Sequence, residues 1–371
     1  MATATDNVYT RFGVRPLINA VGNQTVRGGS TPSAAVKAAI DGADVNFVDM
    51  ETFLRKSGDF IASFLDVEAA YVTAGCYAAM VLSSAAAMTH QHPEKRDQLP
   101  DTTGLKDELV FQQYQRYGYD RAYSVPGSKL VLVGDEEGCT AEEFENAIGP
   151  NTAAIIYLVQ AEKEGGVSLE EAVDIAHRNN VLAIADSAAQ IYPLDYFKRN
   201  AQCADLVCFG GKYFNAPHST GFVCGRRDLI EEVTAHGFIA PRPLGRGMKV
   251  DRQEIVGLLT AIENWFSADH EQRSKDQDAR YNAISQVLEG IPGVSTEIIY
   301  AEKSHTLSSL HVNVDEATVG QNAEQVNDAL EAGTPRIRAN ASDDTVVINA
   351  YTLREGEELI VANRLKEVLT G

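Results

Sequence analysis

The sequence has few cysteines, and their positions suggest neither disulfides nor a metal site. Cys76, Cys139, Cys203, Cys208 and Cys224 include no CxxC pair, show no metal-type spacing and are odd in number. Such a pattern argues against a disulfide framework and against a structural zinc site. We therefore expect reduced thiols and a cytoplasmic location.

Positive charge is also scarce. The chain has 32 Lys and Arg residues against 52 Asp and Glu residues, which gives a formal net charge of -20. This charge opposes association with nucleic-acid phosphates and anionic lipids, so we expect neither as a partner. The uncharged stretch 69–88 has too few large aliphatic residues to predict a membrane span, and residues 1–9 show no secretory signal.

Several familiar catalytic motifs are missing. The sequence contains no Walker-type GxxxxGK[ST], no GxGxxG that opens a helix, and no HExxH. The eight histidines show no metal-ligand pattern, so we expect no metal. Of these, only His218 lies close in sequence to Lys212, whose chemistry is considered below.

From about residue 50, short apolar runs alternate with helical patterns. Nearly continuous hydrophobic strands indicate burial on both faces, hence a mainly parallel sheet covered by helices. The runs are 68–73, 128–134, 152–159, 181–187, 204–211 and 220–226. Capping boxes begin helices at Thr140 and Ser168, and Thr31 with Pro32 predicts another helix start.

Beyond residue 251 the pattern changes. One long helix is expected over 252–288, followed by four short strands and a last helix near 355–369. We therefore predict an α/β protein with a large parallel-sheet domain over 51–250 and a smaller α+β domain over 251–371. Residues 1–50 are expected to form an N-terminal segment that contributes to the active site and to dimer contacts.

Two charged residues follow buried strands. Asp186 ends the run 181–187, and Lys212 comes directly after Gly210 and Gly211. Open α/β sheets bind ligands at the carboxyl ends of their strands. There, a carboxylate that keeps a pyridine nitrogen protonated and a lysine that forms a Schiff base are what pyridoxal 5'-phosphate requires. Taken alone, Asp186 is more typical of a helix cap and Lys212 of a solvated loop, but the two together with Gly75 favour the cofactor.

A glycine turn at Gly75 joins an apolar run to an alanine-rich helix. Unpaired N–H groups and the positive end of the helix dipole favour a phosphate at such a turn. The same glycine would also suit close packing of the strand and the helix. In combination with Asp186 and Lys212, the phosphate interpretation is favoured.

Several cationic residues are candidates for anion binding. Arg354 follows a predicted small-domain strand and could hold a substrate carboxylate in a bidentate pair, a role for which Arg336 and Arg338 compete. Arg246 and Lys249 lie in the glycine-rich segment PLGRGMKV. That segment could contact an anion or serve as a domain hinge.

Many segments, in order along nearly the whole chain, resemble the fold-type I pyridoxal-phosphate enzymes. The resemblance is narrower to the group of L-seryl-tRNA selenium transferase and D-glucosaminate-6-phosphate ammonia-lyase. The matching segments include LINAVGN at 17–23, AAYVTAG at 69–75, GGK at 210–212, GRGMKV at 245–250 and TLREG at 352–356.

The resemblance implies the aspartate aminotransferase-like fold with a seven-stranded sheet, and a role for each matched residue. Asp186 would contact the ring nitrogen, and Lys212 would form the Schiff base. It also implies a homodimer or larger assembly with active sites at subunit interfaces. The other cofactor contacts would be Gly75, Cys76, Tyr77, Gln115 and Ala188; the substrate contacts Asn19, Asn23, Thr25 and Arg354; and the contacts to a neighbour's cofactor Arg246 and Lys249.

The sequence departs from these relatives at three places. Gln115 stands where relatives often carry a histidine, so acid/base work at that position is not expected. Phe209 stands where a serine commonly helps to bind phosphate. The match begins near Met1, whereas the selenium transferase has an additional N-terminal domain that engages tRNA.

The expected reaction is elimination from a small amino acid or an amino-sugar acid. The substrate amine would displace Lys212, the lysine would remove the α-proton, and a β-substituent would leave. Racemisation, retro-aldol cleavage and transamination share the first step, in which the substrate amine displaces Lys212, and they stay open. Selenium transfer to seryl-tRNA is disfavoured by the net charge, and a non-enzymatic scaffold would have no need for Lys212.

Overall fold

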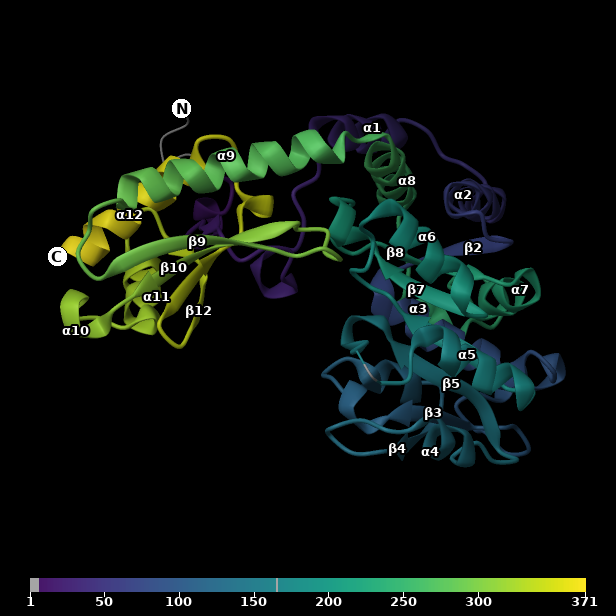
Figure 1. The fold of residues 1–371 in the computed structure, drawn as a ribbon. Helices are drawn as coiled ribbons and strands as arrows, with labels where there is room; N and C mark the ends of the chain where they lie inside the picture. The colour runs from purple at the N-terminus through teal and green to yellow at the C-terminus, as the bar shows by residue number, and fades with distance from the viewer. Residues whose placement is uncertain (1–6, 165) are drawn as a thin grey trace. The chain divides into compact units, whose positions relative to one another are not determined.

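A computed structural model describes residues 7–164 and 166–371, which divide into two compact units (Figure 1). The small unit combines the described part of Met1–Ser30 with Ala268–Gly371, and the large unit is Thr31–Ser267. Within the described residues, none of the helices has the length and apolar character that a bilayer crossing requires.

The large unit is built on a seven-stranded sheet with the strand order β2-β8-β7-β6-β5-β3-β4. All neighbouring strands are parallel except at β8, which is antiparallel to both β2 and β7. This confirms the predicted α/β class. The strands are β2 Ala69–Thr73, β3 Glu108–Gln112, β4 Lys129–Val133, β5 Thr152–Leu158, β6 Leu182–Asp186, β7 Leu206–Gly210 and β8 Gly221–Gly225.

Six of these strands correspond to the predicted apolar runs, and β3 is the one that was missed. Its sequence, ELVFQ, has only three apolar residues between two polar ends. Such a run is too short to be recognised by hydrophobicity alone. Its central position between β5 and β4 buries even Gln112.

Helices cover both faces of this sheet. Adjacent residues of β7 point to opposite faces: Cys208 Sγ lies 3.5 Å from Ser83 Oγ of α3, while the Phe209 ring lies 5.0 Å from that of Phe197 on α6. The helices of the large unit are α1 Ala34–Asp44, α2 Met50–Leu65, α3 Gly75–Thr89, α4 Ala141–Asn146, α5 Leu169–Arg178, α6 Leu194–Cys203, α7 Arg227–His236 and α8 Arg252–Ser267.

The start of α1 differs from the prediction, the start of α4 matches it, and the start of α5 matches it in part. The N-cap of α1 is Ser33 and not Thr31, because the Ser33 hydroxyl accepts from the Val36 N–H at 3.3 Å. Thr140 forms a full capping box with Glu143. At Ser168, the hydroxyl accepts from the Glu171 N–H at 3.2 Å, which is one half of the expected box.

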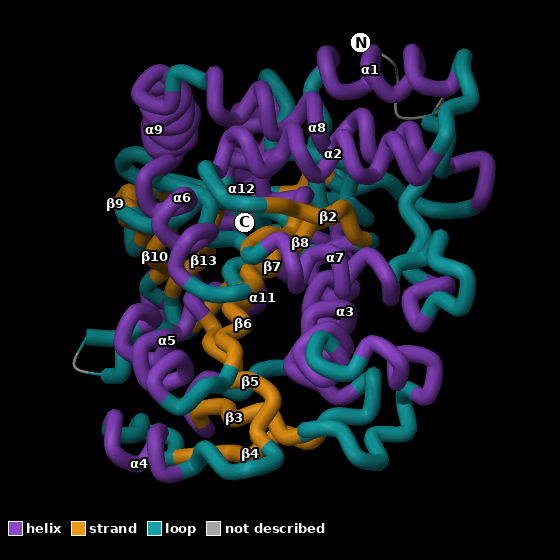
Figure 2. Tube along the Cα trace, turned by 90° about the vertical axis from the view of Figure 1, so that its right-hand side faces the viewer, coloured by secondary structure: helices purple, strands orange, loops and turns teal. Residues whose placement is uncertain are grey.

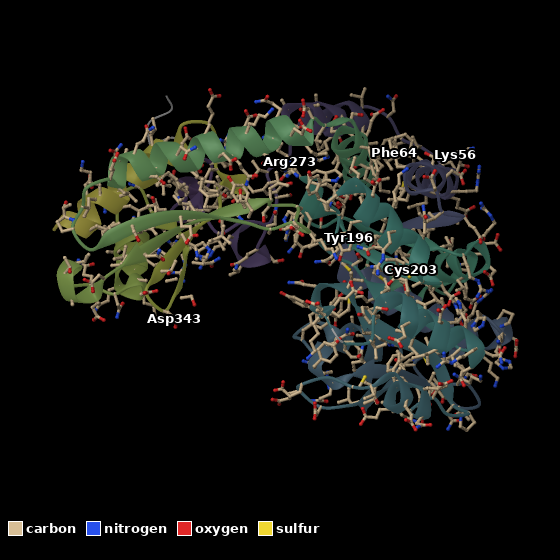
Figure 3. All side chains as sticks on the ribbon, in the orientation of Figure 1. Lys56, Phe64, Tyr196, Cys203, Arg273 and Asp343 are labelled. Atoms are coloured by element: carbon tan, nitrogen blue, oxygen red, sulfur yellow. The ribbon has the colours of Figure 1, made fainter. Side chains whose placement is uncertain are left out.

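The predicted helix over 252–288 is two helices, α8 and α9 His270–Leu288. Asp269 caps α9 by accepting a hydrogen bond from the Gln272 N–H at 2.9 Å, which starts a new helix there. Helix α8 packs on α1 and α2 (Figure 2). The Phe266 ring of α8 lies 5.1 Å from the ring of Phe64, which is labelled in Figure 3. The units therefore divide after Ser267, and after Ser30 rather than near residue 50.

The small unit is an α+β structure around its own core. Its main sheet is antiparallel with the order β12-β13-β10-β9, and β10 buries every second residue against α9, α11 and α12. A separate parallel pair joins β1 to β11. The elements are β1 Ile18–Asn19, β9 Val294–Tyr300, β10 Ser308–Val314, β11 Ile337–Arg338, β12 Asn340–Ser342, β13 Thr345–Ile348, α10 Glu316–Val319, α11 Ala323–Ala332 and α12 Glu357–Thr370.

Gly58 permits the close approach of α2 to β2, and its substitution tests that contact. A Cβ at Gly58 would lie 2.0 Å from the Ala70 carbonyl oxygen, so Gly58→Ala forces the helix away from the strand. We expect the free energy of unfolding to fall by about 1–3 kcal/mol in urea denaturation. Gly42→Ala, in α1 with no atom within 4 Å of the new Cβ, is the control and should be neutral or stabilising by up to about 1 kcal/mol. Equal effects of the two substitutions would contradict this account.

Candidate active site

The predicted cofactor residues of the large unit converge at the carboxyl ends of β6 and β7. Asp186 is the last residue of β6, and Lys212 lies in the 3₁₀ turn Gly211–Phe214 that follows β7. The first turn of α3 reaches the same place, because the Cys76 thiol lies 3.5 Å from Asp186 Oδ1. Residues separated by more than a hundred positions are thus brought together by the sheet topology.

The start of α3 is shaped to receive an anion. Gly75 has a φ of +75°, and the N-cap residue Ala74 makes no side-chain cap hydrogen bond. The first N–H groups of the helix are therefore available to an external acceptor. A Cβ on Gly221 would lie 2.8 Å from the Cys76 nitrogen, so a glycine there keeps that N–H accessible.

Asp186 is buried, at 2% exposed, and is surrounded by hydrogen-bond donors. The Ala188 N–H donates to Oδ1 at 3.0 Å, the Cys76 thiol donates to the same oxygen, and the Tyr117 hydroxyl donates to Oδ2. Burial raises the pKa of the Asp186 carboxyl, whereas these three donors act to lower it. A protonated pyridine nitrogen would give this carboxylate a positive partner, so the site fits the ring of pyridoxal phosphate.

Lys212 is half-buried near Cys76, whose thiol contacts the Asp186 carboxylate. Burial lowers the pKa of its amine, while the nearby Cys76 raises it. Its Nζ lies 5.0 Å from the ring centroid of Tyr213. A lowered pKa leaves a larger fraction of the amine unprotonated, and only an unprotonated amine reacts with an aldehyde.

His218 also lies in this neighbourhood. Its Nδ1 is buried and has no hydrogen-bond partner within the described part of the chain. Burial lowers the pKa of His218, and the positive charge of Lys212 lowers it further. A mostly neutral imidazole near the lysine is a candidate for proton transfer.

The structure gives Gln115 and Phe209 surroundings away from the cofactor residues. The Gln115 amide accepts from the Leu158 N–H at 3.0 Å and donates to the Tyr114 hydroxyl at 3.1 Å. The Phe209 ring lies on the α6 side of the sheet, where it also stacks on Phe222. Neither residue therefore directs a polar group toward Asp186 in the described structure.

Tyr117 is a site residue that was not identified from the sequence. It follows Gln115 by two positions, directly after the segment 112–116, and its hydroxyl reaches both Asp186 and the Met80 sulfur. The signal in the sequence is an aromatic residue close to the expected position. The offset arises because a short 3₁₀ turn, Gln113–Gln115, follows β3.

The remaining predicted contacts differ in their surroundings within each unit. Arg246 donates to the Phe238 carbonyl at 3.3 Å, and Lys249 is exposed. The predicted substrate residues belong to the small unit. There, Asn19 donates to the Gly22 carbonyl at 3.0 Å, Asn23 Oδ1 lies 3.0 Å from His305 Nε2, and Thr25 and Arg354 are exposed.

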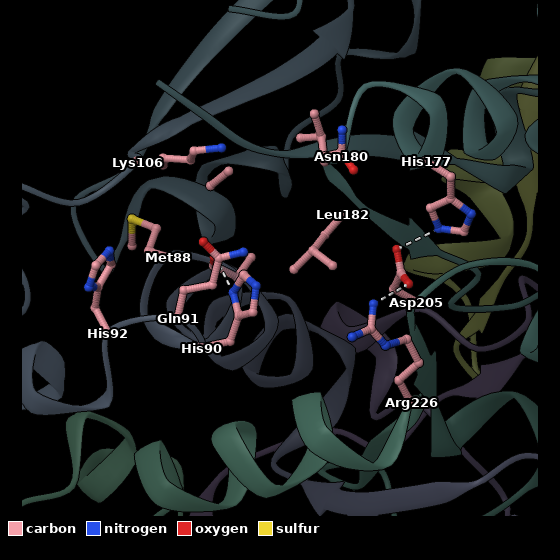
Figure 4. A pocket seen from close by; sticks show the side chains of 13 residues that line it. Met88, His90, Gln91, His92, Lys106, His177, Asn180, Leu182, Asp205 and Arg226 are labelled. Carbon is pink, nitrogen blue, oxygen red and sulfur yellow. Dashed lines mark hydrogen bonds and ion pairs between the residues drawn. The ribbon is translucent and has the colours of Figure 1, made fainter. Parts of the chain in front are cut away.

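A separate pocket of about 530 Å³ opens at the amino ends of the parallel strands (Figure 4). Asp205, at the start of β7, forms ion pairs there with His177 and Arg226, each at 3.0 Å. None of the predicted site residues lines this pocket. Because ligands of open α/β sheets bind at the carboxyl ends of strands, we assign the chemistry to the edge that carries Asp186.

The bond from Tyr117 to Asp186 leads to a pH-dependent stability difference. The pKa of Asp186 is raised on folding, so its ionised form costs folding free energy above that pKa, and the cost disappears as the carboxyl is protonated at lower pH. Tyr117→Phe removes a donor to the ionised form. In the cofactor-free protein it should lower the free energy of unfolding by about 1–3 kcal/mol near pH 8, and by less as the pH falls toward about 5.

Tyr123→Phe is the matched control. The Tyr123 hydroxyl is buried without a partner among the described residues, so its removal should be neutral or stabilising. Chemical denaturation at several pH values measures both variants. A loss that is the same for both tyrosines, or independent of pH for Tyr117→Phe, would contradict the assignment.

Comparison with known proteins agrees with this geometry. The aminotransferase class-V family model matches residues 128–244. The chain is 28% identical to D-glucosaminate-6-phosphate ammonia lyase of Salmonella typhimurium over 98% of both chains. It is 30% identical to 5'-C-glycyluridine monooxygenase-decarboxylase of Streptomyces sp, over 89% of this chain and 83% of the relative. It is 22% identical to L-seryl-tRNA(Sec) selenium transferase of Moorella thermoacetica, over 100% of this chain and 86% of that protein.

Solved structures support the same conclusion. The structure of D-glucosaminate-6-phosphate ammonia-lyase has a TM-score of 0.86 and covers 98% of each chain. A Thermus thermophilus aspartate aminotransferase, 16% identical with a TM-score of 0.53, shares the fold. The expected enzyme class and cofactor are thereby confirmed. The chain belongs to the fold-type I pyridoxal-phosphate-dependent enzymes, in the group similar to D-glucosaminate-6-phosphate ammonia-lyase and L-seryl-tRNA selenium transferase.

Proposed function

We propose that the protein is an ammonia-lyase that acts on a small amino acid or an amino-sugar acid, with D-glucosaminate 6-phosphate as the first compound to test. The observation that carries the proposal is the convergence of Asp186, Lys212 and the start of α3 at one edge of the sheet. The full-length similarity to an ammonia-lyase supports this reaction over others of the same cofactor.

Different residues of the large unit would hold different parts of the cofactor. When bound, pyridoxal phosphate supplies an electron sink for negative charge at the substrate Cα. The Asp186 carboxylate would hold a proton on the ring nitrogen, and the first N–H groups of α3, at Gly75, Cys76 and Tyr77, would bind the phosphate. The Ala188 N–H orients the Asp186 carboxylate through its bond to Oδ1.

Lys212 would act twice, first as the point of cofactor attachment and then as the base. Its Nζ would take the proton from the substrate Cα, which requires an unprotonated amine. Burial favours that form by lowering the pKa of the amine. His218, close enough to be influenced by the lysine charge, is placed to exchange a proton with it.

The other reactions of this cofactor share only the exchange of the substrate amine with Lys212, and each diverges after that step. Elimination releases ammonia, whereas a racemase exchanges the α-hydrogen with solvent without releasing it. An aldolase would release an aldehyde, and an aminotransferase would need a keto acid. Selenium transfer is less favoured because of the lower identity to that relative and the net charge of -20.

We also propose a homodimer in the cytoplasm. Val45, Phe47 and Val48, in the segment between α1 and α2, are exposed, with Phe47 at 92%. Exposed apolar residues close together are typical of protein interfaces. In such a dimer Arg246 and Lys249 would contact the neighbour's cofactor. The cytoplasmic location is supported by the five free cysteines.

Lys212→Ala tests the cofactor assignment. The variant should lose the absorbance of the covalently held cofactor and reduce ammonia release from D-glucosaminate 6-phosphate by at least about 100-fold. Lys198→Ala removes a lysine of α6 that pairs with Asp66 at 2.7 Å, and it should retain both properties. Retained absorbance and activity in Lys212→Ala would exclude Lys212. Hydrogen exchange at Cα without ammonia release by the wild type would exclude the lyase reaction.

Phe47→Asp tests the dimer. A charge introduced into an apolar interface should shift the mass measured by light scattering from that of a dimer toward that of one chain. Val125→Asp, at a residue that is 46% exposed in the same unit, serves as control and should leave the mass unchanged. A wild-type protein with the mass of a single chain would refute the proposal directly.

A further inference from the structure

Arg336 and Arg338 of the small unit both pair with the Glu331 carboxylate, and the charge of Arg27 also acts on it. Arg27, Arg336 and Arg338 all lower the pKa of the Glu331 carboxyl, with the hydrogen bond from Arg336 as the largest contribution. The carboxylate therefore stays ionised, and the group as a whole keeps a net positive charge. Such a concentration of arginines is unexpected in a protein whose formal charge is -20.

Backbone pairing fixes two of these arginines on one face. Strand β11 pairs in parallel with β1, and the Arg336 and Arg338 carbonyls accept from the Ile18 and Ala20 N–H groups at 2.8 and 2.9 Å. Ile337, between them, is fully buried. Since side chains alternate along a strand, both arginines point away from the core on the same side.

The register also brings a predicted substrate residue to this face. Asn19 of β1 is the direct partner of Arg338 across the parallel pair. Directly paired residues of neighbouring strands project to the same face of a sheet. The arginines therefore flank the N-terminal segment that the family resemblance assigns to the substrate pocket.

Glu331 of α11 holds the two guanidinium groups in place and, among the described residues, leaves most of their donors uncommitted. Arg336 donates to its Oε1 and Arg338 donates to its Oε2. A guanidinium has about five N–H donors, so one bond to Glu331 uses a small part of each. Both side chains are about 30% exposed, at 30% and 27%, which leaves them within reach of a ligand.

Arg27 adds a third guanidinium group, and one of its N–H donors lacks an acceptor among the described residues. It ends the 3₁₀ turn Thr25–Arg27, and its Nε is buried without a hydrogen-bond partner among the described residues. A buried donor that lacks an acceptor is unfavourable, because it has lost water and gained nothing. An acceptor supplied by a ligand would remove this cost.

We propose that Arg27, Arg336 and Arg338 form a binding site for a phosphate monoester carried by the substrate. Three positive charges against the single charge of Glu331 leave an excess of two, which a phosphate dianion neutralises and a carboxylate does not. Guanidinium groups also match phosphate oxygens in bidentate geometry. The inference deepens the proposed function and rests on it for the link to the substrate, although the phosphate site can be measured without it.

The test is a calorimetric titration of the cofactor-loaded protein with inorganic phosphate. Loading the cofactor first occupies the phosphate site expected at α3. Arg338→Gln and Arg27→Gln should each weaken phosphate binding by roughly 10- to 100-fold. Arg338→Lys keeps the positive charge but lacks the forked guanidinium, so it should weaken phosphate binding less than Arg338→Gln does. This graded result separates a loss of binding from a folding defect. Arg199→Gln, at an arginine of the large unit that is 31% exposed and paired with Glu170, should bind as the wild type does.

A second measurement uses the pair of D-glucosaminate 6-phosphate and D-glucosaminate. In Arg338→Gln, KM should rise for the phosphorylated compound and stay unchanged for the other. Failure of the wild type to bind phosphate, or unchanged binding in Arg338→Gln and Arg27→Gln, would overturn the site. If neither compound is deaminated but phosphate binding depends on the arginines, the proposed reaction fails and the anion site stands.

Discussion

The site proposed in the large unit depends on one buried carboxyl group. Asp186 is removed from water, which disfavours its ionised form, and the structure compensates with donors from three separate segments. Each donor comes from an element placed by the sheet: the loop after β6, the start of α3 and the segment after β3. Hydrogen bonds alone reduce the cost of the charge without cancelling it. The remaining imbalance would favour a cationic ring beside this carboxylate, as proposed for the cofactor.

The two units carry charged groups of opposite sign. In the large unit a carboxylate is buried among neutral donors and needs a positive partner. In the small unit arginines are held half-exposed around Glu331 and need a negative one. Asp186 and the arginines both lie at strand ends whose backbone N–H and carbonyl groups are paired within the sheets. Their side chains are therefore not needed to satisfy the backbone and can serve binding.

The sequence predicted the sheet and its central pair of residues because both depend on local patterns. Buried strands are continuous apolar runs, and Asp186 and Lys212 directly follow two of them. β3 was missed because three apolar residues carry too little signal. Tyr117 was missed because its contact with Asp186 is created by a turn between β3 and the next segment. The break before α9 depended on a single cap, Asp269, within an otherwise continuous helical pattern.

The thiol of Cys76 lies between the anion-binding turn and the buried carboxylate. Burial raises the pKa of this thiol well above its usual range, and the charge of Asp186 raises it further. The raised pKa keeps the thiol protonated. Oxidants and alkylating reagents react with the thiolate form, which is nearly absent here. At the proposed site, a sulfur atom would therefore lie beside a reactive aldehyde cofactor without acting as a competing nucleophile. Chemical inertness, as much as hydrogen bonding, explains why a cysteine is compatible with this position.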